Sequence, residues 1–377
     1  MIALWLLVSA CGGSSSASHG TPAPSSQPAG SAVASAEPSS SPTTAPGPAS
    51  LVRCNAPVPS GDTLVIGTVA GDPTVVVRDI QDPAHAHTLC TFDPAASSPQ
   101  FVSASQVAYE TAAGQIVRSD LAGGGSTTLV ATFGTAFGSG QYAASPDGRS
   151  LTYIDGNAWH LVDAAGNHVL ASLPAVPGRG TNPDEDDSYL SFSPDGLYIA
   201  WFQTFHAGGA GATAPDQIRR SSDGSLVYST TGMTMAVWSS VPSRLYFRDS
   251  AGNMRRWDPS TKSTSMLALH WIRPRSSPDG RWIAYTLRTS DGLGSVGLYS
   301  VQGNSAANTS PPGRSGARFL NNDLVWYQGE KACSSCFGGA PAPTGVSYIY
   351  DIAGSTEVVS RLSSVLDGWP RTTPPGL

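Results

Sequence analysis

The sequence predicts an all-β fold, a β-propeller built from four-stranded blades. The tetrapeptide Ser-Pro-Asp-Gly occurs three times, starting at Ser145, Ser193 and Ser277, and an apolar strand segment with an aromatic end follows each copy. A second short strand ending in a polar turn follows in phase. Outside the N-terminal run, no window of helical length places apolar residues at a period of 3.6. Repetition at this scale is typical of propeller blades.

Each Ser-Pro-Asp-Gly copy has the residues of a tight turn between two strands. Proline presets φ near −65° at the second turn position, and glycine at the fourth position can take a positive φ. This chemistry predicts a type I turn closed by a glycine bulge. We expect the aspartates to be structural; the alternative is that they line a site (Asp147, Asp195, Asp279).

The spacing of the motif sets the number of blades. The three motif prolines lie 48 and 84 residues apart, and the longer gap equals two units of 42. Degenerate copies fill that gap and extend the series on both sides. The predicted second strands are anchored at seven positions (Val65, Val107, Leu151, Ile199, Leu245, Ile283, Leu324). Seven blades are therefore favoured, with six or eight as alternatives.

The first unit has no clear innermost strand of its own. It contains strand segments at 64–69, 74–80 and 88–92, whereas the chain ends with an unassigned strand-like segment at 362–369. We expect that segment to complete the first blade. A ring closed by strands from both ends of the chain hides its edges.

The repeated segments resemble the WD40-like repeat of TolB-type β-propellers, also called PD40. The resemblance rests on the three Ser-Pro-Asp-Gly segments and extends in weaker form over roughly residues 60–365. It implies that the turn joins the two innermost strands of a blade and that the strand aromatic packs between blades. TolB resembles a six-bladed ring and is a partner-binding protein of the cell envelope, but a shared fold does not establish function.

The N-terminal region resembles an exported lipoprotein. An apolar run ends in Val-Ser-Ala-Cys, similar to a bacterial lipobox, which implies lipidation at Cys11. Residues 12–50 are almost wholly Ser, Pro, Ala, Gly and Thr, a composition typical of a disordered tether. The predicted organisation is a signal segment at 1–11, a tether at 12–50, a propeller at 51–369 and a disordered tail at 370–377. The expected location is extracytoplasmic, anchored to the cell membrane.

The charge and the cysteine content indicate which partners and which disulfide bonds to expect. The formal net charge is −6 with only two lysines, so nucleic acid is not an expected partner. We expect a monomer. Besides Cys11, four cysteines remain, and the economical pairing is Cys54–Cys90 and Cys333–Cys336, with two other pairings open. The Cys-Ser-Ser-Cys segment has two alternatives, a redox-active pair and half of a zinc site.

Ligand-binding candidates lie where the repeat is interrupted. The segments 205–215 and 329–344 are longer than their counterparts and rich in Gly, Ala and Pro. Binding residues concentrate on such loops. The predicted ligand-contact residues are Phe202, Phe205, His206 and Phe337. A weak Ca²⁺ site is the alternative to an exposed acidic loop at Asp184, Asp186 and Asp187. No cofactor is otherwise expected.

The sequence offers no catalytic motif. It contains no Gly-x-Ser-x-Gly and no His-Glu-x-x-His. The favoured function is therefore a non-enzymatic binding or scaffold module for an envelope protein, peptide or glycan. The alternative is a carbohydrate-active propeller, a polysaccharide lyase or glycosidase with histidines or carboxylates converging in its central channel. Only His270 adjoins a predicted innermost strand, whereas His160 falls in an outer strand and His206 in a loop.

Overall fold

The computed structural model describes twelve stretches of the chain: residues 48–58, 63–80, 87–123, 125–131, 142–155, 158–172, 188–203, 215–240, 242–267, 270–308, 310–336 and 340–369. The chain divides into two units, Met1–Ala45 and Pro46–Leu377, and every described residue belongs to the second. The predicted signal segment, most of the tether and the tail lie outside these stretches, as does Cys11. Over the described residues, no helix is long and apolar enough to span a bilayer.

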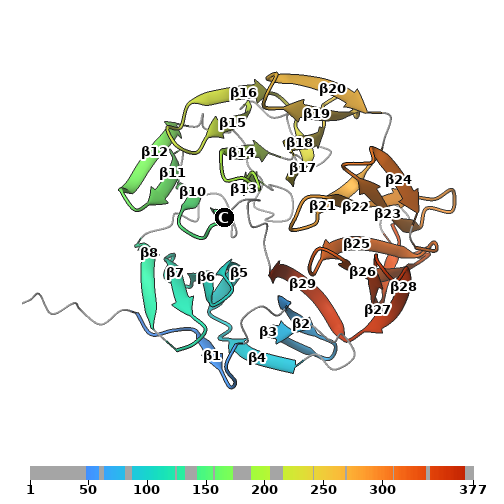
Figure 1. Ribbon diagram of the computed structural model, residues 1–377. Helices are drawn as coiled ribbons and strands as arrows, with labels where there is room; N and C mark the ends of the chain where they lie inside the picture. Colours follow the sequence, from blue (N-terminus) through green and yellow to red (C-terminus); the bar gives the residue numbers. More distant parts are fainter. Residues whose placement is uncertain are drawn as a thin grey trace, which may run out of the picture. The chain divides into compact units, whose positions relative to one another are not determined.

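The described chain forms seven antiparallel sheets arranged as blades in a ring (Figure 1). Blade 1 has the order β1-β4-β3-β2-β29, with β1 (Val52–Cys54), β2 (Leu64–Val69), β3 (Asp72–Asp79), β4 (His87–Phe92) and β29 (Leu362–Trp369). Blade 2 contains β5 (Ala96–Ser103), β6 (Gln106–Thr111), β7 (Ile116–Asp120) and β8 (Ser126–Val130). Blade 3 contains β9 (Tyr142–Ala144), β10 (Leu151–Asp155), β11 (Ala158–Asp163) and β12 (Gly166–Ser172).

The remaining blades follow in chain order. Blade 4 contains β13 (Ser188–Phe192), β14 (Tyr198–Gln203), β15 (Asp216–Arg220) and β16 (Leu226–Thr230). Blade 5 contains β17 (Thr234–Ser240), β18 (Ser243–Arg248), β19 (Met254–Asp258) and β20 (Ser263–Leu267). Blade 6 contains β21 (Ile272–Ser276), β22 (Trp282–Arg288), β23 (Gly294–Ser300) and β24 (Ser305–Asn308). Blade 7 contains β25 (Arg314–Phe319), β26 (Leu324–Lys331), β27 (Ala342–Asp351) and β28 (Thr356–Ser360).

The prediction of seven blades is confirmed, and so is the prediction that the segment at 362–369 closes the ring. The strand from the end of the chain, β29, pairs antiparallel with β2 and supplies the innermost strand of blade 1. Six predicted anchors, Val65 to Ile283, occupy equivalent positions in the pairing of the second strand with the innermost strand. In blade 7 the equivalent residue is Val325, which pairs with Phe319, and not the predicted Leu324. Val325 is buried whereas Leu324 is only partly so, because register and not sequence spacing decides which residue faces the core.

The Ser-Pro-Asp-Gly turns join the innermost and second strands of blades 3, 4 and 6, as the resemblance implied. Gly148, Gly196 and Gly280 have φ of 68°, 70° and 64°. In each turn the serine hydroxyl donates to the aspartate Oδ1 at 2.6 Å. The same Oδ1 accepts the backbone N–H two residues later at 3.0 Å. The turn aspartates therefore hold the turn together, which supports their structural interpretation.

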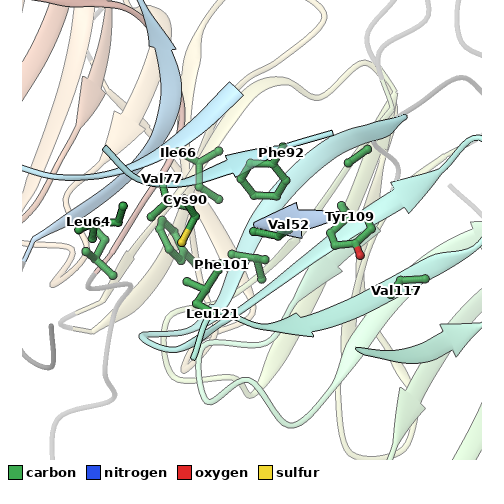
Figure 2. Packing of buried hydrophobic residues seen from close by; sticks show 13 residues of the cluster. Val52, Leu64, Ile66, Val77, Cys90, Phe92, Phe101, Tyr109, Val117 and Leu121 are labelled. Carbon is green, nitrogen blue, oxygen red and sulfur yellow. The ribbon is translucent and has the colours of Figure 1, made fainter. Parts of the chain in front are cut away.

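The hydrophobic core lies between neighbouring blades. Figure 2 shows the cluster between blades 1 and 2, where Ile66 and Cys90 of the first blade pack near Phe101 and Tyr109 of the second. The aromatic residues in the strands that follow the motif also pack between neighbouring blades. Trp201 of β14 joins Trp159 of β11 between blades 3 and 4, and Tyr285 of β22 stacks near Trp271 between blades 5 and 6. Each blade thus depends on its neighbours for burial.

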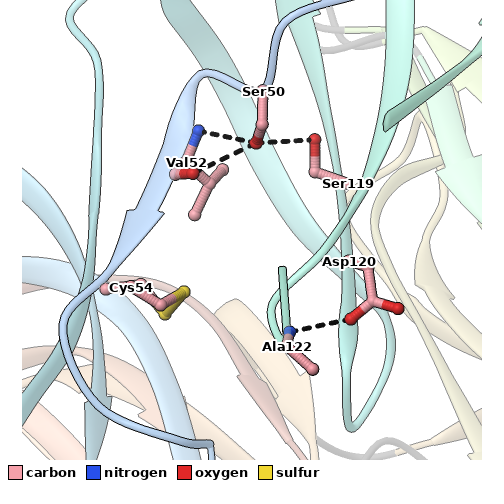
Figure 3. The surroundings of a disulfide bond; sticks show 7 residues. Ser50, Val52, Cys54, Ser119, Asp120 and Ala122 are labelled. Atoms are coloured by element: carbon pink, nitrogen blue, oxygen red, sulfur yellow. Dashed lines mark hydrogen bonds between the residues drawn. A yellow bond between two sulfur atoms is a disulfide. The ribbon is translucent and has the colours of Figure 1, made fainter. Parts of the chain in front are cut away.

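A short strap at 48–54 ties the chain entry to two blades (Figure 3). The Ser50 hydroxyl donates to the Ser119 hydroxyl of β7 at 3.2 Å, and the Leu51 N–H donates to the Tyr109 hydroxyl of β6 at 3.0 Å. β1 then pairs with β4, where Cys54 and Cys90 are opposite each other and form a disulfide. The strap therefore bridges blades 1 and 2 before the first full strand begins.

The second disulfide joins Cys333 and Cys336, so the predicted pairing is confirmed in full. The segment 329–344 is in part an extension of the β26–β27 hairpin, since Glu330 pairs with Pro343 and Lys331 with Ala342. The disulfide closes the turn beyond these pairs. Two disulfides indicate an oxidising, extracytoplasmic compartment.

Candidate functional site

The innermost strands of all seven blades surround a cavity of about 410 Å³ in the centre of the ring. Its wall includes the motif prolines Pro146, Pro194 and Pro278, so it opens at the end of the channel where the Ser-Pro-Asp-Gly turns lie. The repeated motif therefore frames the cavity, although its aspartates are engaged within the turns. Concave sites of this size are the usual places for ligand binding.

Each blade contributes one residue to the cavity at the same register. In each blade, the second-strand residue that follows the anchor (Val325 is the anchor in blade 7) pairs with one residue of the innermost strand. That innermost-strand residue lines the cavity in every blade. We call these seven residues the channel ring: Asp367, Gln100, Ala143, Ser191, Val237, Arg275 and Arg318, in order from blade 1 to blade 7. The ring is therefore a product of strand pairing and not of a sequence motif.

A β-bulge precedes the channel-ring residue in four blades. Ser98, Met235, Arg273 and Gly316 have φ of 49°, 52°, 51° and 69°, and each lies two residues before its channel-ring residue. The pairing register shifts across each of these positions. A bulge bends its strand and re-aims the side chain that follows. In blades 2, 5, 6 and 7 the bulge thus sets the direction of the channel-ring residue.

Two polar members of the channel ring are used to join blades. The Gln100 amide donates to the Tyr142 carbonyl at 3.1 Å and accepts the Ala144 N–H at 3.2 Å, and so bonds the inner edge of β9. The Asp367 carboxylate accepts the Phe101 N–H of β5 at 2.7 Å. Both side chains satisfy backbone groups that face the channel and have no further strand beside them. Their first role is architectural.

The two arginines give the cavity its positive charge. Arg275 and Arg318 belong to β21 and β25, which pack side by side in neighbouring blades. The Arg275 guanidinium donates to the Pro274 carbonyl at 2.8 Å, which restrains its position. Among the described lining residues, the charged side chains are these two arginines and Asp367. These three described side chains therefore carry a formal charge of +1, in a chain whose formal net charge is −6.

Apolar side chains also line the cavity. Ala143 and Val237 occupy the channel-ring positions of blades 3 and 5, and Leu366 lines the cavity with 49% of its surface exposed. Trp238 also lines the wall, but its indole N–H donates to the Ser191 hydroxyl at 3.1 Å and joins blades 5 and 4. The described wall of the cavity thus combines charged, polar and apolar side chains.

Of the ligand-contact residues predicted from sequence, Phe202 is the one that the described stretches include, and it does not line this cavity. Phe202 is 4% exposed and packs between blades 4 and 5 with Trp238 and Phe247. Phe205, His206 and Phe337 lie outside the described residues, as do Asp184, Asp186 and Asp187. Within the described stretches, no group of three His, Cys, Asp or Glu side chains could hold a metal ion.

The described histidines lie away from the cavity wall. His160 is on β11, the third strand of blade 3, where it stacks on Tyr153 at 4.6 Å and hydrogen-bonds Asn167. His270 precedes β21 and is exposed. Neither is a lining residue. The positions of His160 and His270 agree with the sequence prediction.

Sequence reasoning missed Arg275 and Arg318. A signal was present for the first, because Arg275 stands two residues before Ser277, where the other intact motifs have Ala143 and Ser191. When the three motifs are aligned, the position two residues before the serine holds an apolar, a polar and a cationic residue. Arg318 is harder to find, because blade 7 has lost the motif and its register is visible only from the strand pairing.

Comparisons with known proteins support the fold. No protein-family model matches the sequence, and no curated protein matches it. Among solved structures, an oligogalacturonate lyase in complex with manganese has 14% identity and a TM-score of 0.51, covering 78% of this chain and 83% of that one. An oligogalacturonate lyase from Vibrio parahaemolyticus has 12% identity and a TM-score of 0.51, covering 80% and 86%.

TolB from Acinetobacter baumannii is also similar, with 16% identity and a TM-score of 0.42, covering 81% of this chain and 80% of that one. Identities this low show the propeller fold alone. The TM-score for TolB is below 0.5, so this likeness carries no further weight. The fold neighbours include enzymes as well as TolB, and function has to be argued from the site.

Proposed function

We propose that this protein is a membrane-tethered, extracytoplasmic propeller that acts as a non-enzymatic binding module and takes its ligand at the central cavity. The observation that carries this proposal is the chemistry of the channel ring. Seven blades converge on one cavity, and its described wall combines two arginines and one aspartate with apolar side chains. Asp367, the one carboxylate of the described lining, bonds a backbone N–H of the next blade. Side chains of the channel ring thus bond neighbouring blades and make the cavity wall rigid.

The tether and the strap fit the same function. The lipobox-like segment ending at Cys11 and the Ser/Pro/Ala-rich stretch would hold the ring at a distance from the membrane. The strap and its disulfide join that tether to blades 1 and 2. In this proposal the partner is an envelope protein or peptide, and the propeller is a monomer.

A carbohydrate-active propeller is the second candidate, because solved lyases share the fold. The test is turnover by the purified chain on a panel of polyuronides and neutral glycans, with and without divalent metal. We expect no cleavage product above that formed in buffer. Cleavage that is lost in the Arg275→Gln and Arg318→Gln variants would overturn the binding function and assign catalysis to the cavity.

A further inference from the structure

We propose that the disulfide between Cys333 and Cys336 is a thiol–disulfide exchange site, which oxidises a dithiol of another protein. It closes the turn of the β26–β27 hairpin in blade 7, and neither cysteine lines the central cavity. The exchange site is therefore separate from the proposed ligand-binding site and does not depend on it. It is identified by its exposure, by a hairpin that holds its shape below it, and by a hydroxyl group beside one sulfur.

The two disulfides of the chain differ in how easily another molecule reaches them. Cys90 is fully buried in the cluster between blades 1 and 2, and Cys54 packs against the same cluster. Cys333 and Cys336 are only partly buried, and the two serines between them are exposed. Exchange begins with the attack of a thiolate on a disulfide sulfur, so its rate depends on access. The hairpin disulfide is therefore the one that a protein thiol can attack.

The hairpin keeps its shape without the disulfide. Two residue pairs extend the strand ladder as far as Glu330 and Lys331, just below the turn. The Glu330 carboxylate accepts hydrogen bonds from the Arg288 guanidinium at 3.0 Å and from the Gly294 N–H at 2.9 Å, which join the hairpin to blade 6. A disulfide that spans three positions also restricts the unfolded chain little. Reduction should therefore leave the fold intact and the two thiols close together.

A hydroxyl group decides which sulfur leaves. The Ser335 hydroxyl lies 3.6 Å from the Cys333 Sγ and donates to it, because a disulfide sulfur carries no hydrogen. A donated hydrogen bond stabilises the thiolate that forms when the S–S bond breaks, and a more stable thiolate leaves faster. Cys333 is therefore the leaving sulfur, and Cys336 is the sulfur that is attacked.

The exchange moves two electrons and two protons to this chain. A thiolate of the incoming dithiol attacks the Cys336 Sγ, breaks the S–S bond and releases Cys333 as a thiolate, which takes up a proton. The second thiol of the dithiol loses its proton and attacks the mixed disulfide, which releases Cys336 as a thiolate that is protonated in turn. The other protein ends with a disulfide, and the hairpin ends with two thiols.

Equilibration of the purified chain with mixtures of reduced and oxidised dithiothreitol tests the site. Free thiols are alkylated, and mass spectrometry reports each cysteine pair. We expect the hairpin pair to be half reduced at a ratio of reduced to oxidised dithiothreitol at least about 100-fold lower than the Cys54–Cys90 pair. Reduction of the hairpin pair alone should leave the circular dichroism of the chain unchanged, and oxidised dithiothreitol should restore the disulfide.

Reduced thioredoxin supplies the dithiol as part of a protein. One mole of the chain should oxidise about one mole of thioredoxin, which carries a reduction potential of about −270 mV. The double variant Cys333→Ala/Cys336→Ala is the control and should oxidise none, although it keeps the Cys54–Cys90 disulfide. A disulfide that only closes the turn would not transfer electrons in this assay.

Two neighbouring serines provide a matched pair of variants. Ser335→Ala removes the hydroxyl beside Cys333 and should slow reduction by dithiothreitol at neutral pH by at least about threefold. Ser334→Ala changes the adjacent exposed serine and should keep the rate within about 1.5-fold of wild type. Equal rates in the two variants would overturn Cys333 as the leaving sulfur.

Three outcomes would overturn the exchange site itself. They are reduction of both cysteine pairs at the same ratio of dithiothreitol, loss of the folded state when the hairpin pair is reduced, and no oxidation of thioredoxin. None of these outcomes changes the test of ligand binding at the cavity, because the cavity wall contains neither cysteine.

Discussion

The serine of the Ser-Pro-Asp-Gly turn has a larger structural role than its size suggests. Ser193 is fully buried, donates to Asp195 at 2.6 Å and accepts the Tyr198 N–H at 2.9 Å. Ser193→Ala leaves both partners without their bond, and we expect the free energy of unfolding to fall by about 1–2 kcal/mol.

Ser225→Ala is the control for that measurement by urea denaturation. Ser225 donates to Asp223 at 2.6 Å in a similar turn, but it is exposed, so water replaces the lost bond. We expect this variant to lose less than about 0.5 kcal/mol. Equal losses in the two variants would contradict the role assigned to the buried serine.

A charged cluster on blade 7 predicts a dependence of stability on pH. Burial opposes ionisation of Glu357, but hydrogen bonds from Arg314 at 3.0 Å and from Tyr327 at 2.6 Å outweigh it and lower the pKa of this carboxyl below its ordinary value of 4.5. Burial and the same carboxylate raise the pKa of the Tyr327 hydroxyl. The stabilisation is present above about pH 4.5 and is lost as the pH falls through the lower, folded-state pKa.

Glu357→Gln removes this dependence on pH. We expect the gap in unfolding free energy between wild type and variant to be widest near pH 7 and to narrow progressively below about pH 4.5. Denaturation curves at a series of pH values measure it. A gap that stays constant down to about pH 3 would mean that the charge of Glu357 does not stabilise the fold.

At the residue scale, the sequence predicted what depends on local chemistry. The turn glycines, the structural aspartates and the cysteine pairs could be read from the chain itself. The channel ring could not, because a residue such as Arg318 reaches the cavity through its pairing register and a preceding bulge at Gly316. The pairing register and the bulge are each defined by two neighbouring strands and cannot be read from the sequence of one strand.

At the scale of elements, the two disulfides differ in what they restrain. Cys54–Cys90 joins residues 36 positions apart and holds the strap on β4, whereas Cys333–Cys336 joins residues three positions apart in one hairpin. Replacing Cys54 and Cys90 by alanine should lower the unfolding free energy by about 2–4 kcal/mol. Replacing Cys333 and Cys336 should cost less than about 2 kcal/mol, because its loop is shorter.

Thermal unfolding of the two double variants under the same oxidising conditions makes this comparison. If loss of the hairpin disulfide destabilises the chain as much as loss of the strap disulfide, the strap is not the more important restraint. The sequence predicted both pairs, but it gave no sign of the bond from Leu51 to Tyr109 that joins the strap to blade 2.

For the whole molecule, closure of the ring depends on the pairing of β2 with β29. Gly67 lies against the backbone of Ser364, and a side chain at this position would overlap the Ser364 carbonyl oxygen. Gly67→Ala should therefore strain the closure and lower the unfolding free energy by about 1–3 kcal/mol. Gly303→Ala is the control, since its nearest neighbours are the serine hydroxyls of Ser300 and Ser305, which can move.

Hydrogen exchange shows where the strain acts. In Gly67→Ala the amides of β29 should exchange faster than those of β14 in blade 4, because opening starts at the closure. Uniform protection across both strands would contradict closure by the two chain ends. The sequence predicted this closure from a missing strand in the first unit, since a sheet with an unpaired inner edge is incomplete.

The central claim is that the cavity framed by the seven innermost strands receives the partner. The most direct measurement places a photo-crosslinking amino acid at Leu366 in the cavity and, separately, at Val359, which is 71% exposed on the outermost strand β28. Irradiation of cells should give one specific envelope adduct at Leu366, reduced by Arg318→Gln, and none at Val359. An adduct at Val359 alone, or one at Leu366 that is unchanged by Arg318→Gln, would contradict the account.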